Sequence, residues 1–196
     1  SRSVLENLRE PLEEGVVTVS RVRGSLLFPA RFLLIAAMNP CPCGYAGDPE
    51  HACSCSPYQV LQYKRKISGP ILDRIDLHVD VPRVRLEKLQ GSFDGAEPSA
   101  VARERVVAAR ERQRERMREW GKKTNAEMDR RLLEKFCSIE SDVQVFLLQA
   151  AQNFKLSARG YGRVLKVART IADLAGEEQV ALPHVTEALS YRFRDE

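Results

Sequence analysis

The sequence has no long apolar run and little excess of charge of either sign. No segment approaches the ~18 apolar residues of a membrane span, and no apolar secretory segment stands at its start. With 43% hydrophobic and 30% charged residues, it has a globular rather than a disordered composition. Its 31 Lys and Arg against 27 Asp and Glu leave +4, which permits a nucleic-acid surface without arguing for one. We expect a cytoplasmic protein of one or two domains that does not enter a membrane.

A phosphate-binding loop of the form G-x-x-x-x-G-K-[ST] is also missing. The nearest match is Gly121-Lys122-Lys123-Thr124, but Arg116 stands where the first glycine is required and no strand precedes it. We therefore reject this segment as a nucleotide site.

The first residues have the pattern of a helix that lacks a cap. Val4, Leu5, Leu8 and Leu12 recur at helical spacing directly after Ser1. We interpret this start as a cut within a longer protein. Removal of a tag or of an initiator methionine is the alternative.

Residues 1–88 are predicted to form an α/β part that opens with a helix and a hairpin. The helix covers 1–14 and ends at Gly15. Two β-prone runs over about 16–28 flank a short turn that contains glycine, which predicts a hairpin.

Two further strands are expected in the same part. Phe32–Met38 is apolar without alternation, which is typical of a strand buried on both faces of a parallel sheet. After a helix over about 57–67, Ile75–Val81 alternates apolar and polar residues and predicts a half-buried edge strand. This is too little sheet for a whole α/β domain, so the sequence predicts only part of one.

Residues 89–99 have the composition of a linker, and 100–196 are predicted to be entirely helical. The expected helices cover 100–120, 126–137, a stretch that begins at a Ser141–Gln144 capping box, a stretch from a Ser157 cap to Gly176, and about 183–193. The predicted fold class is α/β followed by an all-α domain.

Four cysteines lie within fifteen residues, as Cys41-x-Cys43 and Cys53-x-Cys55. Four thiolates suit tetrahedral zinc, and a cluster without secretion signals is typical of a metal site in a reducing compartment. His51 is an alternative fourth ligand. Disulfides between such close cysteines would be strained, while an iron–sulfur cluster and free thiols stay open. Cys137 follows an apolar run and is interpreted as an inert core thiol.

Three single residues are candidates for phosphate contacts, each with a structural alternative. Asn39 follows the apolar strand, where ligands bind in open sheets, but Asn-Pro also starts turns. Arg74 precedes the edge strand and could act as an arginine finger or pair with a neighbouring aspartate. Arg159 lies in the first turn after Ser157, where a cation opposes the helix macrodipole and a bound phosphate would offset this cost. The alternative is that it belongs to a solvated cationic face.

Basic residues at two places could contact DNA. The predicted hairpin carries Arg21 and Arg23 at its tip, and helix 100–120 has seven arginines against four glutamates. Much of the helix charge is expected to pair along the helix itself. Asp76, His78 and Asp80 share one face of the edge strand, where a polar face explains them as well as a metal would.

Several motifs together resemble the Mg-chelatase-like AAA+ ATPases of the ComM (YifB) type. The matching segments are AAMNPCPCG at 36–44, CSC at 53–55, SGPILDRIDLH at 68–78, LSARGY at 156–161 and VARTIADL at 167–174. The likeness covers nearly the whole chain.

The resemblance implies roles for the candidate residues. Asn39 matches sensor 1, which positions the attacking water, and Arg74 matches the arginine finger that acts on a neighbouring subunit's ATP. Arg159 matches sensor 2, and the hairpin matches the pre-sensor-1 insertion that faces the pore in related rings. The resemblance implies that residues 1–88 are the C-terminal half of an AAA+ P-loop ATPase core and that residues 100–196 are its helical lid.

The resemblance also implies what surrounds this chain in its family. The Walker A and Walker B motifs would precede Ser1, so the chain alone is expected to be inactive as an ATPase. The intact parent would use ATP and Mg²⁺ in a ring, expected to be a hexamer, and act on DNA in branch migration or uptake of transforming DNA. Insertion of Mg²⁺ into a porphyrin is an alternative, although chelatase motor subunits lack the cysteine cluster. A zinc-stabilised DNA-binding module without enzymatic activity is another.

Overall fold

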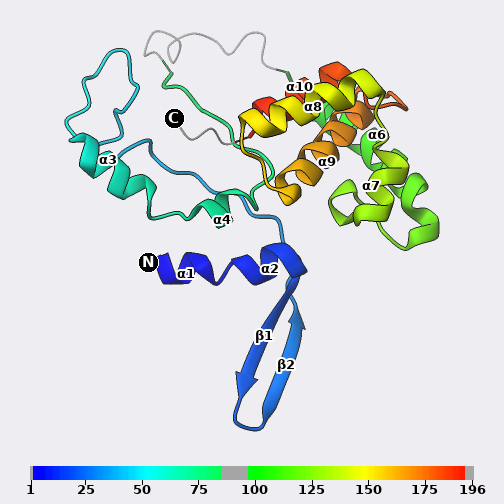
Figure 1. The fold of residues 1–196 in the computed structure, drawn as a ribbon, viewed down its shortest axis with the longest axis horizontal. Coiled ribbons are helices and arrows are strands. Elements are labelled where there is room, and N and C mark those ends of the chain that lie inside the picture. Colours follow the sequence, from blue (N-terminus) through cyan, green and yellow to red (C-terminus); the bar gives the residue numbers. More distant parts are fainter. Residues whose placement is uncertain (1, 85–96, 193–196) are drawn as a thin grey trace. The chain divides into compact units, whose positions relative to one another are not determined.

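The computed structural model describes residues 2–84 and 97–192 (Figure 1). The chain divides into two compact units, the first made of Ser1–Ile75 and Asp80–Arg83, the second of Asp76–Val79 and Val84–Glu196. Most of the predicted linker 89–99 lies outside the described residues. In the ranges that are described, every helix is too short or too polar to cross a membrane.

The first unit begins with two short helices rather than the single predicted helix. They are α1 (Arg2–Glu6) and α2 (Arg9–Glu14). Pro11 explains the break, because it has no N–H to bond the carbonyl of residue 7 and its ring crowds that carbonyl. Gly15 ends α2 in the left-handed region (φ 68°), as predicted.

The hairpin prediction is confirmed. Strands β1 (Val16–Arg21) and β2 (Gly24–Pro29) pair antiparallel around a tight turn, with Arg21 opposite Gly24. Every residue of β2 is exposed, and Figure 1 shows the hairpin extending away from α1 and α2. Its base is tied to α2, where a Glu10 carboxylate accepts hydrogen bonds from the hydroxyl and the N–H of Thr18.

The two other predicted strands are wrong for the described part of the chain. Phe32–Met38 and Ile75–Val81 form no strand, and Leu33, Ile35 and Val81 are each 84% exposed. A strand buried on both faces needs hydrogen-bonding neighbours at its edges. The described strands are β1 and β2, which pair with each other and leave these segments without a sheet to join.

Two helices follow the cysteine-rich loop. Helix α3 (Pro57–Lys64) begins at a Ser56–Gln59 capping box, close to the predicted 57–67. The short α4 (Gly69–Leu72) leads directly into Asp73 and Arg74.

The second unit is helical, as predicted. Its elements are α6 (Ser99–Met117), η1 (Arg118–Trp120), η2 (Asn125–Glu127), α7 (Arg130–Phe136), α8 (Ser141–Asn153), α9 (Ala158–Ala175) and α10 (Leu182–Ser190). Helix α9 is central, because it contacts α6, α7, α10 and η2. Its Val164, Ala168 and Ala172 are fully buried in the main core.

Side-chain caps fix the starts of α7 and α9. The Ser157 hydroxyl accepts a hydrogen bond from the Gly160 N–H at 3.0 Å, and Gly176 ends α9 with φ 84°, both as predicted. The Ser141–Gln144 capping box is wrong, because α8 begins one residue earlier, with Glu140 at the cap and no side-chain cap bond. Asp129 caps α7, so the predicted 126–137 helix is split into η2 and α7.

A buried carboxylate joins the helices of this unit. Asp173 in α9 is fully buried and accepts hydrogen bonds from the side chains of Arg116, Asn125 and Arg169. Arg169 is itself 1% exposed and also donates to the carbonyls of residues 177 and 178. Three segments of the chain therefore depend on one negative charge.

Asp173→Asn should lower the free energy of unfolding of the helical unit by about 3–5 kcal/mol, because it leaves the guanidinium of Arg169 buried without its counter-charge. Urea unfolding monitored by Trp120 fluorescence would measure this. Glu134→Gln breaks the exposed Arg130–Glu134 pair and should cost less than ~0.5 kcal/mol. Equal effects of the two variants would contradict the role given to the buried carboxylate.

Candidate metal centre and phosphate-contact residues

The structure brings the four clustered cysteines together. The ligand sulfurs of Cys41, Cys43, Cys53 and Cys55 all lie within 4.8 Å of one another, and no disulfide joins them. Cys41 and Cys43 Sγ are 3.3 Å apart, Cys43 and Cys53 3.5 Å, and Cys41 and Cys53 3.7 Å. The edge of a tetrahedron with Zn–S bonds of ~2.3 Å is about 3.8 Å, so the cluster fits a tetrahedral metal ion.

The loop backbone supports this arrangement. Gly44 and Gly47 have φ of 86° and 82°, which lets the loop turn back between the two cysteine pairs. The Ala46 N–H donates to the Cys41 sulfur at 3.3 Å. The hydrogen bond from the Tyr45 N–H is the strongest influence that lowers the pKa of Cys43, to about 5.

His51 is not a member of the cluster, so its proposed substitution for a cysteine ligand is wrong in this structure. Its ring stacks on Tyr45 with centroids 5.2 Å apart, and its Nδ1 lies 3.0 Å from Arg83 Nη1. Asp48 pairs with Arg83 at 3.5 Å and accepts hydrogen bonds from the N–H groups of residues 50 and 51. His51 thus belongs to a group of contacts that connects the segment around residue 83 to the cysteine-rich loop.

Arg74 is bound within the first unit. Its Nε lies 3.1 Å from Glu13 Oε2 of α2, and its Nη1 donates to the Pro70 carbonyl at 2.7 Å. The sequence predicted a neighbouring aspartate as the alternative partner, whereas the ion pair in the structure is with Glu13. The side chain is 10% exposed.

Asn39 and Arg159 both stand at the surface of their own units. Asn39 is exposed and its Nδ2 faces Gly44, where an added Cβ would come within 4.0 Å. Arg159 is exposed in the first turn of α9. Farther along α9, Arg163 pairs with Asp76 and Lys166 donates to the Ala126 carbonyl at 2.9 Å. Arg163 and Lys166 therefore both have partners within the unit.

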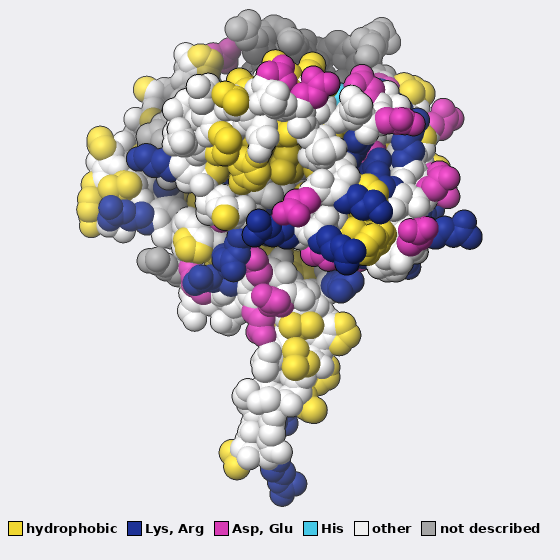
Figure 2. All heavy atoms as spheres, turned by 45° about the vertical axis from the view of Figure 1, so that its right-hand side comes forward, with side chains coloured by type: hydrophobic (Ala, Val, Ile, Leu, Met, Phe, Trp, Pro, Cys, Tyr) yellow, Lys and Arg dark blue, Asp and Glu magenta, His cyan; other side chains and the backbone are white. Residues whose placement is uncertain are grey.

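The two basic regions, the hairpin tip and helix α6, differ in how many of their charges are paired within the chain. Arg21 and Arg23 lie at the hairpin tip beside the fully exposed Val22, and Figure 2 shows basic side chains at the end of the hairpin. In α6, by contrast, Arg105 pairs with Glu97 and Arg114 with Glu111. Arg112 donates to the carbonyl of residue 173, and Arg116 pairs with Asp173.

Among the described residues, the acidic and histidine side chains at 76, 78 and 80 form no metal-binding group, because the four-cysteine set is the single one found there. Asp76 is instead the partner of Arg163. Because no edge strand forms over Ile75–Val81, the polar-face interpretation is not confirmed, and the ion pair with Arg163 accounts for Asp76.

Comparison with known proteins shows the family of this chain. Residues 1–89 match the model of magnesium chelatase subunit ChlI, and 96–192 match that of the ChlI C-terminal region. The chain is 45% identical to competence protein ComM of Haemophilus influenzae over 192 residues. It belongs to the Mg-chelatase-like family.

Other relatives agree. YifB of Escherichia coli is 42% identical over 195 residues, and an uncharacterised protein of Mycobacterium tuberculosis is 42% identical over 194. These matches cover 97–99% of this chain but only 36–37% of the relatives. The chain therefore spans little more than a third of the Mg-chelatase-like proteins that it matches.

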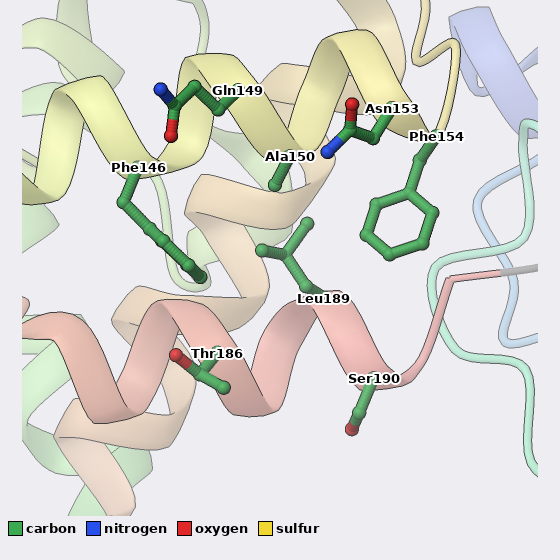
Figure 3. Close-up of a pocket in the computed structure, with 8 residues that line it drawn as sticks. All are labelled: Phe146, Gln149, Ala150, Asn153, Phe154, Thr186, Leu189 and Ser190. Carbon is green, nitrogen blue, oxygen red and sulfur yellow. The ribbon is translucent and has the colours of Figure 1, made fainter.

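One open groove of this Mg-chelatase-like chain lies away from all predicted site residues. It has a volume of about 370 Å³ between α8 and α10, where Phe146, Phe154 and Leu189 face it (Figure 3). Its other lining residues are Ala150, Gln149, Asn153, Thr186 and Ser190. Since no charged side chain lines it, the groove does not suit a phosphate or a metal ion.

A thiol count should separate the cluster from Cys137. Cys137 is 3% exposed, and burial raises its pKa to about 11, so it stays protonated and unreactive at pH 8. With an aromatic disulfide reagent, the zinc-loaded native chain should release close to no equivalents and the denatured chain five. Removal of zinc from the native chain should raise the count toward four, because the metal-free loop can open and expose even the buried Cys41, whereas the helical core still encloses Cys137.

Matched serine variants give the control for this count. Cys43→Ser should lose most of the bound zinc in elemental analysis, whereas Cys137→Ser should keep it. Four reactive thiols in the presence of stoichiometric zinc, or no metal in protein purified without chelator, would contradict a metal site.

Proposed function

We propose that this chain is the sensor, arginine-finger and lid part of a ring-forming AAA+ ATPase that moves DNA. The observation that carries the proposal is the exposed hairpin with Arg21 and Arg23 at its tip, on a chain 45% identical to a competence protein. A narrow, solvent-exposed and basic projection is suited to contact a polyanion that passes through a ring. We propose DNA uptake or branch migration as the process that this motion serves, in the bacterial cytoplasm.

Three residues are proposed to contact the nucleotide. ATP, bound with Mg²⁺, supplies the phosphoryl group that is transferred to water. Asn39 offers an amide that can orient the water, and Arg159 offers a guanidinium from the lid to the phosphates. Arg74 offers a second guanidinium to the ATP of a neighbouring subunit, where it stabilises the developing charge. Amide and guanidinium groups match phosphate chemistry, which supports these assignments.

We assign the cysteine cluster to structural zinc. Four sulfur ligands leave no open coordination position, and such closed sites hold a fold rather than carry out chemistry. Zinc bound by Cys41, Cys43, Cys53 and Cys55 would fix the loop that begins directly after Asn39. The metal therefore orders the chain next to the proposed sensor.

The cluster also separates the proposal from the Mg-chelatase alternative. The resemblance implies that the motor subunits of porphyrin-metallating chelatases have no cysteine cluster in this loop. The cluster in this chain therefore favours the ComM-type role. A zinc-stabilised module that binds DNA without ATP is the second candidate. The exposed charges of the hairpin tip support this module as well as they support an ATP-driven motor. ATP dependence of DNA movement decides between them.

Arg21→Ala with Arg23→Ala should weaken binding of the chain to duplex DNA at least ~10-fold at low salt. It should also reduce the slope of log K against log salt by about 1.8, because two phosphate contacts are lost. Fluorescence anisotropy of a labelled duplex at several salt concentrations measures both. Arg103→Gln with Arg110→Gln removes two exposed charges from α6 and serves as control. Loss of binding in the control alone would move the site to α6.

The role of Arg74 requires a protein that carries this chain together with the family's Walker motifs. There, Arg74→Ala should lower kcat for ATP by roughly 10³-fold, as removal of arginine fingers does elsewhere. Arg65→Ala, an exposed arginine after α3, should leave kcat unchanged. Steady-state phosphate release, with gel filtration to confirm assembly, provides the measurement. Full turnover by an assembled Arg74→Ala ring would refute the assignment.

A further inference from the structure

A second basic surface lies on the helical unit around Trp120, the single tryptophan of the chain. Arg131 Cζ lies 5.0 Å from the centroid of its ring and Lys135 Nζ lies 5.2 Å from it. Lys135 is also 5.2 Å from the ring of Phe136. Two cations and two aromatic rings therefore alternate within one patch, which we call the Trp120 patch.

Both cations of the Trp120 patch are exposed, and both come from α7. They stand four residues apart, so they lie on the same side of the helix. Trp120 precedes them across the η2 turn and is partly exposed. Their charged ends lie over its ring, which restricts the two long side chains while both remain exposed to solvent.

In the described part of the chain, two cations next to the Trp120 patch, unlike those within it, are paired with carboxylates. Arg130 pairs with Glu134 of the same helix at 3.0 Å. Lys122 donates to the Glu127 carbonyl and pairs with Asp129 at 3.2 Å. For Arg131 and Lys135, by contrast, the described residues include no carboxylate within 4.0 Å. An aromatic ring holds a cation but does not cancel its charge, so this patch keeps two positive charges for a partner.

The chemistry of the patch selects that partner. Two fixed cations complement the phosphates of a polyanion, and holding them in advance lowers the entropy cost of binding. Partly exposed aromatic rings beside them offer stacking surfaces to bases that are not paired. An acidic protein or an anionic membrane would use the charges but not this stacking.

We propose that the Trp120 patch binds single-stranded DNA and is a second nucleic-acid contact, separate from the hairpin. The proposal rests on the proposed function in taking DNA as the polymer. It adds that the lid touches an unpaired strand through Trp120, Arg131 and Lys135.

Because Trp120 is the only tryptophan, its intrinsic fluorescence reports on the patch directly. Titration of the zinc-loaded chain with a mixed-sequence single-stranded oligonucleotide should quench this emission to saturation. The same oligonucleotide with a fluorescent label gives the affinity of each variant by anisotropy.

Arg131→Gln with Lys135→Gln should weaken oligonucleotide binding at least ~10-fold at low salt. The salt slope should fall by about 1.4, the value for two phosphates on a single strand. Arg103→Gln with Arg110→Gln removes the same charge from α6 and should change affinity less than ~2-fold. Circular dichroism checks that each variant is folded, and both pairs replace exposed side chains.

The outcomes distinguish this proposal from the proposed function. If the oligonucleotide binds without quenching Trp120, or if both charge variants weaken binding equally, the patch is not the site. The hairpin variants still test DNA binding on their own. Quenching by phosphatidylglycerol vesicles but not by DNA would overturn the proposal in favour of a membrane surface. Absence of DNA binding in every assay would overturn both.

Discussion

The helical unit depends on the buried carboxylate of Asp173. Its two oxygens receive hydrogen bonds from α6, from the η2 turn and from its own helix, so one group sets the positions of three elements. The arrangement tolerates little change, because Arg169 is almost as deeply buried as the carboxylate, so loss of either charge would leave the other buried and unpaired. The first unit has a comparable centre in its four thiols. In the helical unit the carboxylate lies beside a large apolar core, whereas the thiol cluster brings together two separate stretches of one loop.

Features that depend on nearby residues were predictable from the sequence. The Ser157 cap, the Gly176 end of α9 and the cysteine cluster each follow from residues close together in the chain. The hairpin was also predictable, since its strands pair across a short turn. Phe32–Met38 was not, because whether an apolar run becomes a strand depends on partner strands that a local pattern does not reveal.

Side-chain partners that are distant in the sequence could not be predicted. The Glu13–Arg74 pair joins α2 to the segment after α4, and no spacing rule connects the two residues. The Trp120 patch was missed for another reason. Its cations follow the tryptophan within fifteen residues, but the η2 turn that brings them back onto the ring has no clear periodic signal. The arginine content of α6 overstates its free charge, because Arg105, Arg112, Arg114 and Arg116 all have partners within the chain.

Arg74 is another residue whose charge is paired within the chain, although its proposed partner lies outside it. In this structure its guanidinium is occupied by a carboxylate and a carbonyl and is 10% exposed. An arginine that reaches the phosphate of a neighbouring subunit must therefore exchange Glu13 for that phosphate. Since both partners are anions of similar geometry, the exchange costs far less than desolvating a free guanidinium would. If Arg74 has the proposed role, Glu13 holds the arginine in a defined position until a nucleotide on the adjacent subunit competes for it. In the proposed ring, assembly rather than any change within one chain would then provide the stronger anion.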